Sequence, residues 1–284
     1  MVNGCILCGS NKLTSEKIGQ ETVMTCHNCH FQFLENYKNE HEYYLDYEEV
    51  KHNYKKEMEI LRKKQYELDA AHFVKNCVPG SILDVGCSAG LFMHEICRKA
   101  PPPYSKILDF TGIDPDIGAI EYAQKNALSN MVYFCTDFLN FQTNKKFDTI
   151  LFRGTLQYMS DDIRQTFIKL KKLLKENGKI IIYFLPSFYN FIFYLLKEKW
   201  CLFDSVESKL MFNEDVIYFI EKEFDLNLLE LSYPYIGSAY ENRLTDFNNV
   251  IEVIKNGKSM TNIPFYGNVM QIVFENKKRG AKFD

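Results

Sequence analysis

Four cysteines near the amino terminus have the spacing of a metal site. Cys5 and Cys8 form one C-x-x-C pair, and Cys26 and Cys29 form a second pair after 17 intervening residues. Two such tight turns can present four thiolates in a tetrahedron, the geometry that Zn²⁺ prefers. We therefore predict a closed, structural zinc site on a small ribbon, with four reduced, metal-free cysteines as the alternative. A segment this short buries too little apolar surface to be stable alone, so metal binding would contribute to its folding.

A glycine-bearing turn marks a second place where chemistry is expected. Residues 81–85 form an apolar stretch typical of a strand, and Gly86 and Gly90 lie in the turn that leads into a helix. Glycine lacks a Cβ, so its backbone can bend sharply and come close to a ligand. A strand, a turn and a helix in this order can hold a nucleotide, although an ordinary tight turn is the alternative.

Acidic residues end the next two apolar segments. Residues 110–114 end in Asp114 and residues 131–137 end in Asp137, and further apolar segments follow at 147–153 and 178–184. Segments with helical patterns separate these strands, which predicts a doubly wound α/β fold with a parallel sheet. Both acids would then lie at carboxyl ends of strands, where such sheets bind their ligands.

Five short motifs occur in a fixed order, at residues 83–90 (LDVGCSAG), 112–116 (GIDPD), 136–138 (TDF), 147–148 (FD) and 155–158 (TLQY). Over residues 79–185 the chain resembles the class I S-adenosylmethionine-dependent methyltransferases. The chain departs from that family at Ser88, which replaces its usual middle glycine, and at Tyr158, where many relatives have histidine. The resemblance implies a Rossmann-like, seven-stranded sheet with an antiparallel strand near residues 270–274 inside it.

The resemblance also implies how S-adenosylmethionine would be bound. Backbone amides of the turn at residues 86–90 would bind the methionine carboxylate, and Asp84 would approach the ammonium group. Asp114 would accept hydrogen bonds from both ribose hydroxyls, and Asp137 with Phe138 would hold the adenine. A surface cap or turn role is the alternative for each aspartate. The complete predicted cofactor set is Asp84, Gly86, Cys87, Ser88, Gly90, Asp114, Pro115, Asp137, Phe138, Arg153, Gly154 and Thr155.

A hydroxyl acceptor would also need a base to take its proton. All six histidines lie at or before residue 94, so no histidine can come from the later part of the chain. The candidate catalytic residues are Tyr158, Asp204, Glu207 and Glu241, with His52 and His72 as further possibilities. Arg243 could instead bind an anionic part of the acceptor. An ordinary exposed residue is the alternative for each.

Three regions of the chain would position the predicted metal, cofactor and catalytic residues. We predict a zinc ribbon at 1–39, a helical linker or lid at 40–78, and the methyltransferase domain at 79–284, with insertions near 186–212 and 235–268 covering the substrate side. The linker could fold over the pocket or be a plain surface helix. In either case its predicted apolar stripe consists of Ile60, Leu61, Leu68, Ala71, Phe73 and Val74.

The composition is that of a soluble globular protein. The chain has 284 residues, 46% of them hydrophobic, and a net charge of −3, so it has no overall basic surface for nucleic acid. Nine cysteines, an odd number scattered through predicted strands and helices, favour a reducing cytoplasm over a disulfide framework. We expect no signal peptide and no membrane insertion, because the apolar stretch at 180–196 is interrupted and short.

The leading functional hypothesis is O-methylation of a small molecule or carbohydrate. The ribbon followed by EHEYY at residues 40–44, and PFYGN at 264–268, resemble methyltransferases that act on nucleotide-sugars, phosphorylated sugars or capsule precursors. Sugar C-methyltransferases that share the ribbon carry a further carboxyl-terminal domain, which favours oxygen here. Methylation of ribosomal RNA is an alternative, although Lys12 and Lys17 are the only basic residues before Lys38. A non-catalytic cofactor-binding module is a third.

Overall fold

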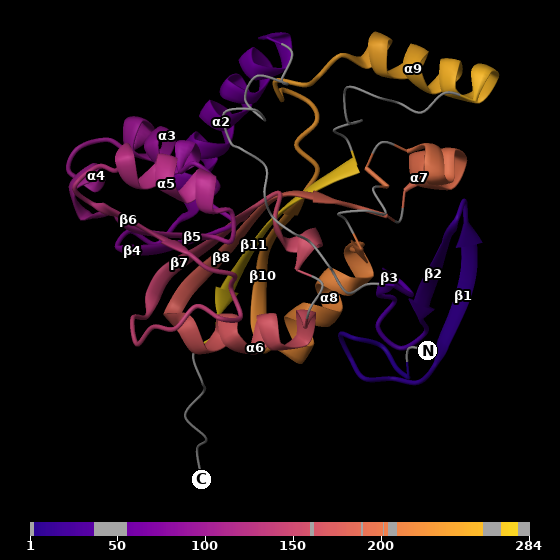
Figure 1. The fold of residues 1–284 in the computed structure, drawn as a ribbon, viewed down its shortest axis with the longest axis horizontal. Coiled ribbons are helices and arrows are strands. Elements are labelled where there is room, and N and C mark those ends of the chain that lie inside the picture. Colours follow the sequence, from indigo (N-terminus) through magenta and orange to yellow (C-terminus); the bar gives the residue numbers. More distant parts are fainter. Residues whose placement is uncertain are drawn as a thin grey trace.

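The computed structural model describes residues 3–36, 56–159, 162–188, 190–200, 202–203, 209–257 and 268–277. Its largest element is a seven-stranded sheet with the strand order β10-β11-β8-β7-β4-β5-β6 (Figure 1). Its strands are β4 (Ser81–Val85), β5 (Asp109–Asp114), β6 (Met131–Cys135), β7 (Phe147–Arg153), β8 (Leu174–Pro186), β10 (Leu226–Ser232) and β11 (Val269–Asn276).

Strands β4 to β8 run parallel, and β11 lies antiparallel between β8 and β10. The central strands are apolar on both faces: Leu83 and Val85 pack into one core cluster, and Ile82 packs into another. A strand buried on both sides explains why these segments are continuous apolar runs. The predicted α/β fold and its interior antiparallel strand are confirmed.

Helices cover both faces of this sheet. The face that carries Ile82 packs against α2, α3 and α5, and the opposite face packs against α6 and α8 (Figure 1). No helix in the described part of the chain has the length and apolar character needed to cross a bilayer. The helices are α2 (Lys56–Asn76), α3 (Leu91–Lys99), α4 (Tyr104–Ile107), α5 (Ile117–Lys125), α6 (Ile163–Leu173), α7 (Phe191–Leu196), α8 (Glu214–Glu223) and α9 (Arg243–Asn256), with 3₁₀ turns η1 (Leu156–Tyr158) and η2 (Lys197–Lys199).

The amino-terminal segment forms a second sheet, and we call residues 3–36 the cysteine ribbon. Its strands β1 (Leu13–Ile18), β2 (Glu21–Cys26) and β3 (Gln32–Leu34) pair antiparallel. A fourth strand, β9 (Leu210–Met211), pairs with β3 and comes from far along the chain. The ribbon sheet is thus completed by a segment of the first predicted insertion, as the position of the ribbon beside α7 and α8 also shows (Figure 1).

Aromatic side chains bury the contact between the two sheets. Phe31 and Phe33 are both 0% exposed, and they belong to the same core cluster as Leu156 and Phe212. The ring centroids of Phe31 and Phe212 are 5.3 Å apart in an edge-to-face arrangement, a favourable geometry for aromatic pairs. Arg164 adds a polar contact, because its Nη1 donates to the Leu7 carbonyl at 2.9 Å. The ribbon therefore obtains from the larger sheet the core that it is too short to build alone.

Two details of the predicted elements were wrong. Strand β8 begins at Leu174, not at residue 178, because Leu174 pairs with Phe147 of β7. The predicted apolar stripe of α2 faces the core only in part: Ile60 is 61% exposed and Leu68 is 40% exposed, while Phe73 is buried and Val74 packs against the same cluster.

The face of α2 that contacts the sheet combines polar side chains with the buried Ala70 and Phe73. His72 accepts or donates through both ring nitrogens, at 2.7 Å from Tyr183 Oη and 2.9 Å from Glu230 Oε2. Buried polar groups are stable only when they find such partners, so these hydrogen bonds allow polar residues on this face. The polar side chains on this face, spaced three or four residues apart, are Gln65, Asp69, His72 and Asn76.

Candidate functional site

The turn between β4 and α3 is built from residues in the left-handed conformation. Gly86 has φ 74° and Gly90 has φ 72°, and a Cβ added to Gly86 would lie 2.3 Å from Thr155 Oγ1. These two positions therefore require glycine. Ser88 also has a positive φ, of 48°, which explains why a glycine is usual at this position in the family that the motif resembles.

The backbone amides of this turn donate to the protein itself. Gly86 and Cys87 both donate to the Ile113 carbonyl, at 2.8 and 3.1 Å, and Ser88 donates to Asp114 Oδ2 at 2.9 Å. These bonds fasten the turn to β5. These three amides already have acceptors within the protein, and the predicted binding of a ligand carboxylate by the turn at residues 86–90 stays a prediction.

Asp114 links the ends of two strands. Its Oδ2 accepts from Ser88, and its Oδ1 accepts from the Asp116 amide at 2.9 Å. Burial raises the pKa of this carboxyl above its usual value. Each carboxylate oxygen has a second lone pair, so Asp114 can still accept two hydrogen bonds from a ligand, one on each oxygen.

Asp84 is the most unusual acid in the described part of the chain. It is 2% exposed, and its Oδ1 has no hydrogen-bond partner among the described residues. Burial, together with the nearby charge of Asp114, raises the pKa of Asp84 to about 7, although Arg153 opposes this shift. Buried polar atoms in proteins are almost always paired, so this oxygen indicates a place for a cationic or hydrogen-bond-donating ligand.

Two cavities meet at Gly86, and we call them together the cleft. The first is lined by Val85, Gly86, Ile113, Pro115, Thr136, Asp137, Phe138, Leu139, Thr155, Tyr158, Met159, Asp162 and Thr166. The second is lined by Arg62, Tyr66, Asp84, Gly86, Cys87, Ser88, Ala89, Leu91, Phe92 and Arg153. The structure therefore brings nine of the twelve predicted cofactor residues to the walls of these two cavities, at the carboxyl ends of the parallel strands, whereas Gly90, Asp114 and Gly154 line neither.

The first cavity ends at Asp137 and Phe138. Asp137 accepts from the backbone and the side-chain amide of Asn140, at 2.9 and 2.6 Å. Phe138 is 2% exposed, and its ring packs edge-on against Phe152 at 6.2 Å. Asp137 thus has a turn-stabilising role as well as a position on the cavity wall.

The second cavity has a wall supplied by α2 through Arg62 and Tyr66, two residues that were not among the predicted site residues. Arg153 Nε and Nη2 lie 3.0 and 2.9 Å from Asp69 Oδ2, and its guanidinium stacks 4.1 Å above the Tyr66 ring. Gln65 Nε2 in turn donates to Asp69 Oδ1 at 2.6 Å. The overlooked signal was the helically spaced polar stripe of α2, which an analysis of apolar periodicity does not detect.

The predicted catalytic residues are not all brought together. Tyr158 lines the first cavity. Glu241 instead accepts from the Gly237 amide at 2.6 Å and from Arg243 at 2.9 Å, and these contacts lower its pKa. Asp204 and Glu207, like His52, lie outside the described residues. Gly154, which belongs to the predicted cofactor set, donates its backbone amide to the carbonyl of Tyr183 at 2.9 Å.

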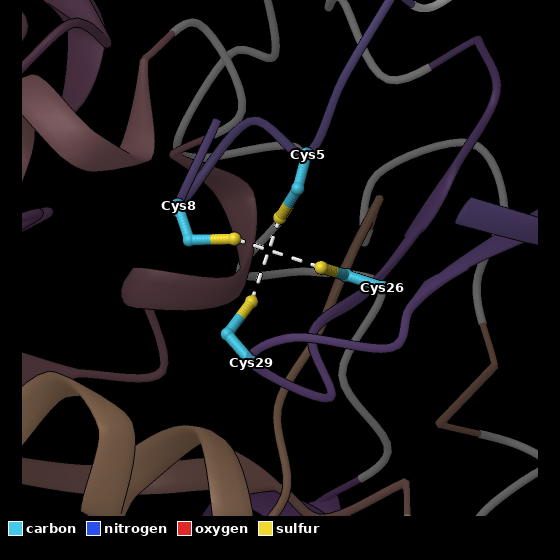
Figure 2. A group of neighbouring side chains, drawn as sticks. All are labelled: Cys5, Cys8, Cys26 and Cys29. Atoms are coloured by element: carbon cyan, nitrogen blue, oxygen red, sulfur yellow. Dashed lines mark hydrogen bonds between the residues drawn. The ribbon is translucent and has the colours of Figure 1, made fainter. Parts of the chain in front are cut away.

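The four cysteines of the ribbon converge from two turns, as Figure 2 shows. The Sγ atoms of Cys5 and Cys29 lie 3.5 Å apart, those of Cys8 and Cys26 lie 3.6 Å apart, and all four lie within 4.8 Å of one another. Asn28 donates to Cys26 Sγ from its backbone and to Cys8 Sγ from its side chain. The hydrogen bond from Cys29 lowers the pKa of the Cys5 thiol to about 5. This arrangement fits the tetrahedral thiolate shell of Zn²⁺.

Comparison with known proteins agrees with the fold. Residues 82–178 match a family described as a methyltransferase domain. This segment is a methyltransferase domain. It contains β4, both glycines of the turn and the acids Asp84, Asp114 and Asp137, so the cleft lies largely within it.

Relatives of the methyltransferase domain differ in what they do. Malonyl-[acyl-carrier protein] O-methyltransferase 1 from Ilyobacter polytropus is 23% identical over 175 residues, 62% of this chain and 60% of that protein. The plantazolicin methyltransferase BpumL, solved with a substrate analog and SAH, superposes with a TM-score of 0.51 at 19% identity, covering 82% of this chain and 92% of that one. The [4+2]-cyclase SpnF superposes with a TM-score of 0.52 at 11% identity, covering 74% of this chain and 80% of that one. At these identities the superpositions establish the fold alone.

Proposed function

We propose that this protein transfers a methyl group from S-adenosylmethionine to an oxygen of a small-molecule or carbohydrate acceptor. The observation that carries the proposal is the cleft, in which Asp84 and Asp137 line the two cavities that meet at Gly86, while Asp114 holds the glycine turn through the Ser88 amide. The methyltransferase domain and an SAH-bound structure of similar fold support it.

The residues of the cleft fit the three parts of this cofactor, which when bound supplies an activated methyl group. The unpartnered Oδ1 of Asp84 suits the ammonium group of the methionine end. Asp114 has one remaining lone pair on each oxygen for the two ribose hydroxyls. Asp137 and the buried ring of Phe138 bound the cavity into which the adenine would extend.

The contribution of the protein to such a reaction is mainly alignment. The left-handed turn at Gly86 and Gly90 is fixed to β5 by backbone hydrogen bonds, so the groups around it are held in place before a ligand binds. A fixed site converts a bimolecular encounter into an oriented one, which can contribute about 7–11 kcal/mol to lowering a barrier.

A carboxylate is a second candidate for the acceptor group. A hydroxyl needs a base, but Glu241 is held by Arg243 and has a lowered pKa, which weakens it as a base. A carboxylate is already ionised at neutral pH and needs none. The name of the relative from Ilyobacter polytropus, a malonyl-[acyl-carrier protein] O-methyltransferase, also favours this class. The chain spans about 60% of the length of that relative.

For the cysteine ribbon we propose one structural zinc ion, bound by Cys5, Cys8, Cys26 and Cys29. Four buried or half-buried thiols within 4.8 Å would leave no open coordination position, so this metal would stabilise the ribbon rather than take part in the reaction. We retain 1–39, 40–78 and 79–284 as the proposed ribbon, linker and methyltransferase regions.

The test of the methyltransferase proposal is calorimetric titration with S-adenosylhomocysteine. Wild-type protein should bind one equivalent, and Asp114→Ala should weaken binding by about 100-fold or more, because two charge-assisted hydrogen bonds are lost. Asp109→Ala is the matched control on the same strand, since its side chain is 59% exposed. Absence of binding by folded wild-type protein would refute the proposal, and unchanged affinity in Asp114→Ala would show that the ribose site is misplaced.

A further inference from the structure

Helix α9 carries an apolar stripe on its exposed side. We call this set of residues the α9 stripe: Leu244, Phe247, Ile251 and Ile254. The first, second and fourth of these side chains are 72%, 63% and 56% exposed, and the third is partly exposed. A different side of the helix packs inward, where Val250 and Val253 are buried in a core cluster. The α9 stripe is therefore not needed to attach α9 to its own chain.

Helix α7 extends this apolar region beside α9. Phe193 and Leu196 of α7 share a buried cluster with Val250, and Lys199 Nζ lies 3.4 Å from the position that a Cβ on Gly257 would occupy. The outer side chains of α7 are also apolar and exposed, namely Phe191, Tyr194 and Leu195. Both helices lie at the periphery of the molecule, with α9 outermost (Figure 1). Large apolar side chains that gather on a surface in this way are typical of a docking site.

We propose that a second copy of this chain docks on this surface, with α9 of the two copies packed antiparallel. The inference is independent of the proposed function. The spacing of the α9 stripe is three, four and three residues, which is typical of helix pairs and is the same when it is read in either direction from Asn249. An antiparallel partner therefore places Leu244 opposite Ile254 of the partner subunit, and Phe247 opposite Ile251 of the partner subunit. Such a self-complementary pattern is what a two-fold symmetric interface requires.

The polar residues that flank the α9 stripe are compatible with this pairing. The charged residues at the flanking positions are Arg243 on one side and Lys255 on the other. In the antiparallel arrangement Arg243 lies beside Val250 of the partner subunit, and Lys255 lies beside Asn248 of the partner subunit, so no like charges meet. Arg243 is also paired with Glu241 at 2.7 Å. The rim of the interface is thus polar without being repulsive.

The exposed area is of the size that a stable dimer needs. A standard interface buries about 800 Å² on each partner. An aromatic side chain can bury roughly 150–250 Å², and the surface formed by α7 and α9 exposes three of them together with leucine and isoleucine side chains. These helices can therefore supply most of such an interface.

A bilayer is a poorer match for the same surface. The charged residues of η2 and α9 are Lys197, Lys199, Arg243 and Lys255 against Glu198, Asp246 and Glu252. Two of these bases are held in ion pairs, with Glu16 and Glu241. The surface therefore has no excess of basic residues to attract anionic lipids.

The experiment measures the mass of the full, zinc-loaded chain by sedimentation equilibrium. At about 100 μM, above the micromolar end of the affinities that interfaces of this size reach, wild type should have twice the chain mass of 33.4 kDa. Leu244→Glu and Ile254→Glu should each be monomeric, with Kd raised by about 100-fold or more, because each buries an unpaired carboxylate. Asn256→Glu is the matched control, since it adds the same charge on the opposite side of α9 and should remain dimeric.

Disulfide trapping tests the antiparallel arrangement. Leu244→Cys and Ile254→Cys, mixed and then oxidised, should form a covalent dimer. Neither variant alone should form it above the background of oxidised wild type, which measures the contribution of the native cysteines. Covalent dimers of Leu244→Cys alone would instead indicate parallel helices and would overturn the proposed pairing.

The remaining outcomes concern the choice of partner. A monomeric wild type would refute the proposal, and its binding to vesicles of phosphatidylcholine and phosphatidylglycerol would then assign the surface to a bilayer. A dimer that persists in both glutamate variants would refute it as well, because another surface would have to form the contact. Both variants should keep the free energy of unfolding of wild type at about 0.1 μM, where a micromolar dimer is dissociated, since the altered side chains are exposed in the single chain. Loss of the dimer is thereby distinguished from loss of the fold.

Discussion

The cysteine ribbon and the cleft share one plan of construction, but apolar contacts complete the ribbon whereas polar contacts complete the cleft. Each has ligand-type residues in short motifs, and each is completed by a segment distant in the sequence: β9 for the ribbon and α2 for the cleft. In the ribbon, the added contacts are backbone pairs and buried phenylalanines. In the cleft, the added contacts are the polar side chains of one helix face.

This difference has a consequence for how each region responds to change. Apolar contacts such as Phe31 with Phe212 lose free energy in proportion to the area exposed, and they are insensitive to pH and ions. Paired polar groups depend strongly on charge and on the presence of both partners. We therefore expect the ribbon to respond to metal and to core substitutions, and the cleft to respond to pH and to charge.

The largest effect should follow loss of a metal ligand. Cys26→Ala should reduce bound zinc from about one per chain to nearly none, because three thiolates and an alanine cannot close the tetrahedron. Stability should fall by more than ~5 kcal/mol, because metal affinity is part of the folding free energy. Metal analysis and thermal unfolding check this, and Cys135→Ala, at an exposed cysteine, is the control.

The same variant tests whether the two regions are independent. No described ribbon residue lines either cavity, so S-adenosylhomocysteine affinity should change by less than about threefold at a temperature where the variant is folded. Stoichiometric zinc in Cys26→Ala would contradict the metal site. A large loss of affinity would contradict the separation of the ribbon from the cleft.

The next effect concerns the contact between the sheets. Phe31→Ala should lower the free energy of unfolding by about 3–5 kcal/mol, because it leaves a cavity in a fully buried cluster. Denaturant unfolding of zinc-loaded protein measures this change. Phe247→Ala on α9 is the control, since Phe247 is 63% exposed and its removal should change stability by less than about 0.5 kcal/mol. Equal effects would mean that the ribbon is not docked on the larger sheet.

The smallest effect is the pH dependence of the cleft. Burial and the charge of Asp114 raise the pKa of Asp84 to about 7, and only the ionised form attracts an ammonium group. Affinity for S-adenosylhomocysteine should therefore rise roughly five- to tenfold from pH 6 to pH 7.5, a change that calorimetry resolves. Asp84→Asn should remove this dependence, and 5′-methylthioadenosine, which lacks the ammonium group, should not show it. A flat profile in wild type would exclude the proposed contact of Asp84.

The sequence predicted the central sheet well because its signals are local. The apolar runs before Asp114 and Asp137, and the glycines that require φ above zero, are each determined by a few adjacent residues. The sequence did not predict the elements that form only through contacts between distant residues. Leu210 and Met211 are too short a segment to indicate a strand, and only their pairing with Phe33 and Gln32 makes them one.

In the candidate site, the sequence indicated the acids but not their surroundings. Nothing local shows that the amides of Gly86 and Cys87 are taken by Ile113. The residues of the opposite wall were missed for a further reason: we expected the buried face of α2 to be apolar, whereas Gln65 and Asp69 are buried at 2% and 4% exposure. Such a face is stable only because partners across the sheet satisfy it.

The pairing of β3 with β9 also has a consequence for the protein during its synthesis. The ribbon emerges from the ribosome first, but its sheet cannot be completed until residues 210–211 have followed. At about 5–20 residues per second, that delay is roughly 10 to 40 seconds. Throughout this interval Phe31 lacks its partner Phe212, so part of the apolar surface of the ribbon stays exposed. We expect the ribbon to mature only after most of the chain has been made, although it is the first part to emerge.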